Sequence, residues 1–428
     1  MKHFYLSFTF ILFLLTGIAQ SQNADYIFKN VNIITMKDDK ILKKQIIAIK
    51  DGKIVDIGKK TKYTAKNIID AKGKFLMPSM ADAHVHLPAT DDDLENFLLL
   101  NLINGVTKLR SMRGVWDDFD RKEKYNAQKS YLPKLYISTP PIHQGYNLSA
   151  EVMENYVIAS KDFDFIKILS IKNEETLRQL DSFCKKHNVS LGGHFPHTKG
   201  ETFPDELTLS AYKYIEHLGG LIGEPETFAN RMQLIKDNNI VICPTMQWYA
   251  IGYGQYGIDE MLNQRGMEYI PLAVKTDWAE KSKIYREKLG KDGFEQEKAK
   301  YAKEMQERFD VTKKLQEQGT TLLISPDCST KFIVPGFGML EEMKLYKKSG
   351  LSNYEILKTA TTNFALLFDE NYGTIEIGKD ADFLLLSKNP LENISALENI
   401  DEIFFNNNYI TNKDLKAFSE FLLSKVQN

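Results

Sequence analysis

Cysteine is scarce in this sequence. Three cysteines, Cys184, Cys243 and Cys328, are spread over 428 residues. An odd and sparse set does not build a disulfide framework. Cys184 falls in a helical pattern, and Cys243 lies in an apolar run typical of a core strand. Cys328 is expected to be a buried packing residue, with a reactive thiol as the alternative.

An excess of charge of one sign is also lacking. The formal net charge is -2, and no cluster of basic residues stands out. The sequence therefore gives no electrostatic footprint for nucleic acid or for a membrane surface. With 43% hydrophobic and 26% charged residues, the composition is that of a globular protein with one large and one smaller domain. A small-molecule partner is expected, and a homo-oligomer is left open.

Long hydrophobic runs are absent after the first 22 residues. The run Phe8–Leu15 follows Lys2 and precedes small and polar residues, a pattern typical of a secretory signal peptide over residues 1–22. A membrane anchor is the alternative, but the run is too short to span a bilayer. We expect an exported protein, periplasmic or secreted, with no membrane association after cleavage.

The two ends of the chain have the same character. Residues 26–35, 46–50 and 53–57 alternate apolar and polar side chains between turn signals, as short antiparallel strands do. Residues 373–386 and 402–410 resemble them. The sequence thus predicts one small β-sandwich domain from residues 23–76 plus 372–428.

Strands and helices alternate between these ends, over residues 77–371. Such alternation predicts an α/β fold with a parallel sheet, and eight repeats favour a (β/α)8 TIM barrel over a doubly wound open sheet. In a barrel the active site lies at the C-terminal ends of the strands. Residues 255–318 exceed an ordinary connection and predict either a lid or a solvated helical insertion. The eight strands are expected at 75–86, 106–110, 134–139, 164–169, 189–194, 213–217, 239–243 and 320–326.

Histidines gather at the ends of these strands. His84 and His86 end the first strand, and because residues i and i+2 of a strand share a face, both imidazoles can enter one pocket. His143 follows the third strand, His194 ends the fifth, and His217 ends the sixth. His197 comes three residues after His194, whereas His187 lies in a predicted helix. This segregation indicates a metal site, since imidazole is a frequent metal ligand.

Two further residues, like these histidines, lie within or at the end of predicted strands. Lys167 lies in the apolar strand 164–169, where an isolated ammonium is costly and needs a partner or a modification. Asp327 ends the eighth strand, as a ligand, a general base or a cap on the loop that follows.

The pattern resembles the amidohydrolase superfamily, in particular its branch of imidazolonepropionase-like and Xaa-Pro dipeptidase-like hydrolases. The resemblance covers nearly the whole chain after residue 22. The motifs that carry it are Ala81-Asp-Ala-His-Val-His86, Asp164-Phe-Ile-Lys167, Gly192-Gly-His194, Tyr214-Ile-Glu-His217, Cys243-Pro-Thr245, Ser325-Pro-Asp327 and Gly378-Lys-Asp-Ala-Asp382.

The resemblance implies a site for two divalent metal ions. His84, His86 and Asp327 would bind one ion, and His194 and His217 the other. Lys167, carbamylated by carbon dioxide, would bridge the two, with an unmodified lysine in a one-metal site as the alternative. Zinc is the expected ion, and manganese or iron are alternatives.

The same resemblance implies a mechanism. A hydroxide activated by two ions would attack the carbon of an amide in a dipeptide or cyclic amide, and Asp327 would pass the proton to the leaving nitrogen. The chain departs from the family at Ser325-Pro326, where Gly-Thr is usual, and at Pro78-Ser79, where Pro-Gly is frequent. After the third strand, Pro140-Pro-Ile-His143 replaces a glycine-rich segment.

Substrate-binding residues are expected after the strands on the same end. The candidates are His143, His197, Arg113, Trp248 and Tyr249, and a structural role is the alternative for each. Hydrolysis of a lactone or another ester by the same site remains open. Deamination is disfavoured, because that branch uses a glutamate soon after the fifth-strand histidine. A non-catalytic binding protein on the same barrel is a third reading.

Overall fold

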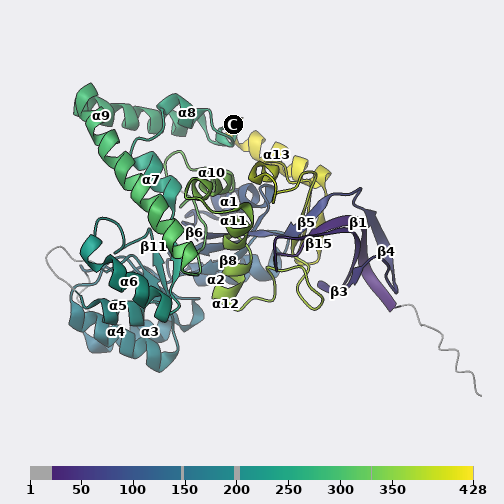
Figure 1. The fold of residues 1–428 in the computed structure, drawn as a ribbon, viewed down its shortest axis with the longest axis horizontal. Helices are drawn as coiled ribbons and strands as arrows, with labels where there is room; N and C mark the ends of the chain where they lie inside the picture. The colour runs from purple at the N-terminus through teal and green to yellow at the C-terminus, as the bar shows by residue number, and fades with distance from the viewer. Residues whose placement is uncertain (1–21, 146–148, 197–202, 329, 428) are drawn as a thin grey trace, which may run out of the picture.

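The computed structural model describes residues 22–145, 149–196, 203–328 and 330–427 (Figure 1). The predicted signal peptide therefore lies, except for Gln22, outside the described residues. Among the described residues, no helix combines the length and the apolar character needed to cross a membrane.

Strands from both ends of the chain form one sheet of eight strands, at the right of Figure 1. Its order is β15-β14-β13-β5-β1-β2-β3, and β4 lies beside β1. The two ends meet where β13 pairs antiparallel with β5, with Leu384 opposite Met77. The strands are β1 (Gln22–Ile34), β2 (Ile41–Lys50), β3 (Lys53–Gly58), β4 (Tyr63–Asp70), β5 (Phe75–Pro78), β13 (Phe383–Leu386), β14 (Glu402–Phe405) and β15 (Asn408–Ile410).

Aromatic side chains hold this sheet together on one face. Phe28, Phe383 and Phe404 are fully buried. The ring of Phe28 meets the other two edge-on at 5.3 and 6.0 Å between centroids, and those two are stacked on each other. Because each comes from a different strand, the contact joins the N-terminal and C-terminal strands through one core. The boundaries of the small domain stay a prediction.

Parallel strands and helices alternate between the two ends, so the chain is an α/β protein. Two parallel sheets have the orders β6-β7-β8 and β12-β11-β10-β9. A parallel bridge from Ser138 to Phe165 connects them. Their strands are β6 (Met80–Val85), β7 (Val106–Ser111), β8 (Lys134–Ile137), β9 (Ile166–Ile168), β10 (Leu191–Gly193), β11 (Tyr214–Glu216) and β12 (Val241–Cys243).

The predicted strand at 320–326 is wrong in its assignment. This segment makes one isolated parallel bridge, from Ile242 to Leu322, and a second, from Val85 to Cys328, follows just after it. Pro326 has no N–H to donate, and Asp327 takes a left-handed backbone with φ 62°. A regular ladder therefore does not form, although the segment still lies beside both β12 and β6.

Some helices begin and end at clear local signals, and α4 is an example. In α4, the Asn173 side chain accepts a hydrogen bond from the backbone N–H of Thr176, and Asn188 ends the helix in the left-handed conformation. The helices are α1 (Asp91–Ile103), α2 (Asp118–Gln128), α3 (Ala150–Ala159), η1 (Ser160–Asp162), α4 (Glu174–His187), α5 (Asp205–Ala211), α6 (Pro225–Asp237), α7 (Met246–Gly252), α8 (Ile258–Leu262), η2 (Met267–Tyr269), α9 (Leu272–Glu317), α10 (Phe337–Lys348), α11 (Asn353–Thr359), α12 (Thr362–Phe368), η3 (Ile394–Glu398) and α13 (Asn412–Gln427).

Two helical predictions need correction. The sequence pattern predicts one helix near 352–368, but the structure has two, α11 and α12. They are separate because the backbone carbonyl of Ala360 accepts a hydrogen bond from the N–H of Ala81 and Thr361 leaves the helical conformation. The helices α7, α10 and α13 were not predicted. The start of α10 follows Gly336 at φ 75° in a run of Pro, Gly and Phe, which reads as a loop.

The insertion at 255–318 is built mainly from α9. Gly290, with φ 68° and ψ 167°, divides α9 into two arms, which diverge at the upper left of Figure 1. The second arm packs against α7 and α10. The insertion thus reaches the C-terminal ends of the parallel strands.

Candidate metal centre

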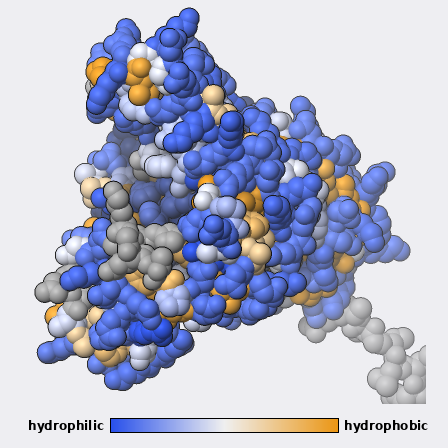
Figure 2. Space-filling model, turned by 60° about the vertical axis from the view of Figure 1, so that its left-hand side comes forward, coloured by the Kyte–Doolittle hydropathy of each residue, from blue (hydrophilic) through white to orange (hydrophobic). Residues whose placement is uncertain are grey.

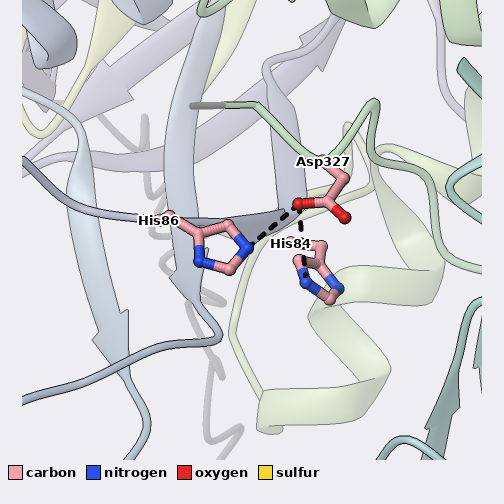
Figure 3. A group of neighbouring side chains, drawn as sticks. All are labelled: His84, His86 and Asp327. Atoms are coloured by element: carbon pink, nitrogen blue, oxygen red, sulfur yellow. Dashed lines mark hydrogen bonds and ion pairs between the residues drawn. The ribbon is translucent and has the colours of Figure 1, made fainter. Parts of the chain in front are cut away.

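His84, His86 and Asp327 meet at one point, although the aspartate lies 241 positions after His86. The Nε2 atom of His86 lies 3.0 Å from Asp327 Oδ1, and Nε2 of His84 lies 3.8 Å from the same oxygen. One ligand atom from each of the three falls within 4.8 Å of the others. Figure 3 shows both imidazoles directed at the carboxylate. This is a donor set suited to a divalent metal ion.

The other two predicted histidine ligands adjoin this group. The ring of His217 lies 4.8 Å from the ring of His84 and 4.7 Å from that of His194, between centroids. His84 lies 5.4 Å from His86 on its other side. Four histidines from three strand ends therefore form one continuous row, as the prediction of a shared metal site requires.

The backbone is turned sharply where these side chains leave their strands. His217, Thr245 and Asp327 have φ values of 63°, 50° and 62°. Such left-handed conformations are uncommon for residues other than glycine and gather at functional sites. Gly193, before His194, has φ 136°, and a Cβ there would lie 2.3 Å from the carbonyl oxygen of Ile168. Only glycine fits this position without moving β9.

Burial holds His84, His194 and His217 in the neutral form. Desolvation brings the pKa of His84 and His217 well below the usual value and that of His194 to about 3. Burial alone would raise the pKa of Asp327, but the electrostatic influence of the neighbouring His84 and the hydrogen bond with His86 outweigh this effect, so the pKa is lowered. Neutral imidazoles beside an ionised carboxylate are the protonation states that metal ligands need.

Lys167 lies beneath this row in β9 and is 1% exposed. Its Nζ atom is buried without a hydrogen-bond partner among the described residues. Burial lowers the pKa of this ammonium to about 8, against a smaller opposing effect of Glu216. The neutral amine, which is the form that reacts with carbon dioxide, is therefore accessible just above neutral pH. A buried amine without a hydrogen-bond partner among the described residues, next to histidines and a carboxylate, suits a lysine that would be carbamylated and would help to hold two ions.

Glu216 and Arg110 also belong to this group, although the sequence pattern did not single out either residue. The Oε2 atom of Glu216 lies 2.7 Å from Nδ1 of His84, and its other oxygen accepts from Arg110. Both residues are fully buried. The carboxylate keeps the proton of His84 on Nδ1, which leaves Nε2 free to bind an ion. A charged residue within an apolar strand was the available signal, because the same signal pointed to Lys167.

Thr245 sets the orientation of His217 in a similar way. Its Oγ1 lies 2.5 Å from Nδ1 of His217 and donates its own proton to the Pro244 carbonyl at 2.8 Å. Nδ1 must then be the donor, so Nε2 of His217 carries the free lone pair. Glu342, fully buried in α10, accepts from the backbone N–H groups of Met246 and Gln247 and so fixes the start of α7 next to Thr245.

The insertion touches the centre through Arg308, on the second arm of α9. Its Nη1 donates to the backbone carbonyl of His217 at 3.0 Å. Its guanidinium carbon lies 3.3 Å from the centroid of the Tyr249 ring. A hollow of about 300 Å³, called here the metal-side hollow, opens against His194 and His217 and has Tyr249 and Arg308 in its wall. Small molecules therefore have a route to the ligands.

The predicted substrate-binding residues differ in how close they lie to the metal-ligand candidates. Tyr249 and Trp248 lie close to the centre, with rings 6.1 and 6.4 Å from that of His217. Arg113 and His143 are exposed beyond the ends of β7 and β8, and Nδ1 of His143 accepts from the backbone N–H of Gly145. His197 lies outside the described residues. Of the five candidates, the geometry brings Tyr249 and Trp248 to the ligands.

Comparison with protein families gives one match: the sequence model of the amidohydrolase family matches residues 172–411. Among individual proteins, the imidazolonepropionase of Thermoanaerobacter pseudethanolicus is 27% identical over 376 residues, which are 79% of this chain and 83% of that protein. The 5'-deoxyadenosine deaminase of Methanosarcina mazei is 46% identical over 68 residues. The chain spans only 16% of the length of this relative.

A solved structure described as a Xaa-Pro dipeptidase with methionine bound in the active site has a similar fold. Its TM-score is 0.67 at 19% identity, over 90% of this chain and 99% of that one. At this level of identity the likeness concerns the fold alone.

Proposed function

The chain belongs to the amidohydrolase family, and from this premise we propose that it is a metal-dependent hydrolase of a carbon–nitrogen bond in a small molecule. One observation carries the proposal: His84, His86 and Asp327 lie together, and the rings of His217 and His194 continue the same group. Fold-level likeness alone would not justify an activity, whereas this grouping of possible metal ligands supports one.

The candidate ligands divide into two groups in this proposal. His84, His86 and Asp327 would hold one ion and His194 and His217 a second, and Lys167, once carbamylated, would supply a further carboxylate-like ligand. Zinc suits the mixture of imidazole and carboxylate, and manganese or iron are the alternatives. When bound, the ions supply a water with lowered pKa and polarise the carbonyl of the substrate.

The residues of the chain supply the proton transfers. Asp327 has a lowered pKa and is ionised at neutral pH, so it can accept the proton of the attacking water and deliver it to the leaving nitrogen. Glu216 holds His84 in the tautomer that binds an ion, and Thr245 does the same for His217. Tyr249 and Arg308 line the metal-side hollow, where the carbonyl of the substrate would lie.

A closed (β/α)8 barrel is part of the proposal. The isolated bridges Ser138 to Phe165, Ile242 to Leu322 and Val85 to Cys328 support it, because each would join neighbouring strands of such a barrel. We also propose that residues 23–76 and 372–428 form a β-sandwich domain and that the chain is exported with a signal peptide over residues 1–22. The apolar run Phe8–Leu15 supports export.

The substrates proposed first are dipeptides and cyclic amides. The Xaa-Pro dipeptidase and imidazolonepropionase likenesses support them. Deamination is a second candidate, favoured by the short match to a 5'-deoxyadenosine deaminase. Hydrolysis of a lactone or ester at the same centre and a non-catalytic binding role remain further alternatives.

A substrate panel tests the proposal. Purified protein loaded with zinc or manganese is assayed with dipeptides, cyclic amides, lactones and 5'-deoxyadenosine, and the amine, acid or ammonia released is measured. Turnover of a dipeptide or cyclic amide that is lost in His84→Ala supports the proposal. Turnover restricted to the nucleoside would replace it with deamination, and turnover unchanged in His84→Ala would refute the metal mechanism.

A further inference from the structure

A second hollow, called here the insertion hollow, lies beside the metal centre and has no role so far. It has a volume of about 460 Å³ and is enclosed by α7, both arms of α9 and the loop after Asp327. This volume is in the range of small-molecule sites, roughly 300–1,000 Å³. Figure 2 shows that the face of the molecule is hollowed beneath the lobe at the top.

The insertion hollow adjoins the metal-side hollow through two aromatic side chains whose rings meet edge-on. Trp248 lines the insertion hollow and Tyr249 the metal-side hollow, and their rings lie 4.8 Å apart. On another side, Thr330 lines the insertion hollow and donates its hydroxyl to the backbone carbonyl of Asp327 at 3.3 Å. A molecule with its reacting bond at the metal ligands would therefore extend past Trp248 into the insertion hollow.

The walls of the insertion hollow combine aromatic rings with positive charge. The rings of Trp248, Tyr285, Phe294 and Phe332 face four cations. One acidic residue, Glu297, also lines the hollow, and its carboxylate accepts a hydrogen bond from the hydroxyl of Tyr285. The four cations are Lys281, Arg286, Lys298 and Lys331.

Two of the four cations have polar partners, whereas the other two make no ion pair among the described residues. Lys281 pairs with Asp277 at 2.8 Å. Arg286 donates to the Tyr256 carbonyl and lies 4.6 Å from the centroid of the Phe294 ring. Lys298 and Lys331 have no carboxylate within ion-pair distance in the part of the chain that the structure describes.

On the basis of the proposed function, we infer that the insertion hollow binds the part of the substrate that carries an aromatic ring and a carboxylate. Lys298 is the principal anion-binding residue, because it is half-buried in the wall and its charge is unmatched. A carboxylate there gains a charge-assisted hydrogen bond, while the rings cover the apolar part. The substrate class is then an N-acylated aromatic amino acid or a dipeptide with such a residue at its C-terminus.

Binding is tested with a probe that has no bond to hydrolyse. Calorimetric titration of the metal-loaded protein compares 3-phenylpropionate with the neutral 3-phenyl-1-propanol. The carboxylate should bind at least about tenfold more tightly, and Lys298→Met should remove most of this preference. Lys300→Met, an exposed lysine on the same helix that does not line the hollow, is the matched control and should bind as the unaltered protein does.

Equal binding of 3-phenylpropionate by the unaltered protein and Lys298→Met would overturn the inference and would place the anion on the metal centre. Turnover separates this inference from the proposed function. With N-acetylphenylalanine as substrate, Lys298→Met should raise KM about tenfold and leave kcat within about twofold. Selective binding without any hydrolysis would refute the proposed function alone, whereas hydrolysis with KM unchanged in Lys298→Met would refute this inference alone.

Discussion

The carboxylate of Glu216 lies 2.7 Å from Nδ1 of His84, so the two groups form a direct hydrogen bond. Glu216 also pairs with Arg110, so one buried carboxylate joins a metal-ligand candidate to a buried cation. The arrangement sets both the ring orientation and the tautomer of His84.

Glu216→Gln should weaken metal binding without removing any ligand. The amide presents one acceptor and one donor, so it cannot serve both His84 and Arg110 as the carboxylate does. Loss of such a partner typically costs about 10–100-fold in metal affinity. Zinc affinity, measured by competition with a chelating dye, should fall by about this factor.

The same substitution should reduce stability, because Arg110 is left buried without its counter-ion. Breaking a buried pair typically costs about 3–5 kcal/mol. Glu226→Gln, at an exposed position of α6, is the control and should change neither property appreciably. Unchanged zinc affinity in a folded Glu216→Gln variant would contradict the role given to Glu216.

Lys167 should carry carbon dioxide in the metal-loaded protein. Its buried, unpartnered amine with a pKa of about 8 is available as a nucleophile near neutral pH. Mass spectrometry under non-denaturing conditions should show an adduct with the mass of carbon dioxide, lost in Lys167→Met. Metal uptake should also slow in buffer freed of carbon dioxide and recover when bicarbonate is added. Uptake of two ions without an adduct would show that Lys167 acts unmodified.

Glu342 should make stability depend on pH. Burial raises its pKa to about 8, against the two backbone N–H groups that favour the carboxylate. Because the folded pKa lies above the unfolded value, the contribution of this acid is present at low pH and is lost as pH rises toward 8. The free energy of unfolding should therefore fall by up to about 1.4 kcal/mol per pH unit between pH 5 and 8.

Chemical denaturation across this pH range measures the effect. In Glu342→Gln the fall should be clearly smaller, because the amide does not titrate. Equal slopes in the two proteins would show that other groups cause the pH dependence.

Lys108 and Asp382 should couple the parallel strand β7 to the C-terminal strands that begin with β13. Their Nζ and Oδ2 atoms are 2.6 Å apart, and the ammonium lies 3.7 Å from the centroid of the Tyr372 ring. Asp382→Asn leaves Lys108 buried without a counter-ion and should cost about 3 kcal/mol or more. The double variant Lys108→Met/Asp382→Asn should recover part of this loss. A purely additive result in denaturation would show that the pair is not coupled.

The sequence predicted the metal-ligand candidates because of where they lie along the chain. A polar residue that ends an apolar strand points to the mouth of a parallel sheet, and this rule located His84, His194 and His217 without any long-range information. The partner of Arg110 could not be found in this way, because Glu216 lies 106 positions away and only the folded sheet brings the two together.

The elements that the sequence missed depend on tertiary contacts. α7 begins at a left-handed Thr245, and the buried Glu342 from α10 satisfies its first N–H groups. No local capping signal marks this start. The bend at Gly290 and the insertion hollow likewise arise from the packing of two arms, which a charged helical pattern alone does not specify.

Metal content tests the account most directly, because it asks whether residues from distant strands share ions. Protein produced with zinc or manganese in the growth medium is analysed for metal per chain, alongside the double variant His84→Ala/His86→Ala and the control His187→Ala on α4. The unaltered protein and the control should hold two ions per chain, and the double variant at most one. Less than one ion in the unaltered protein, or equal content in all three, would contradict the account.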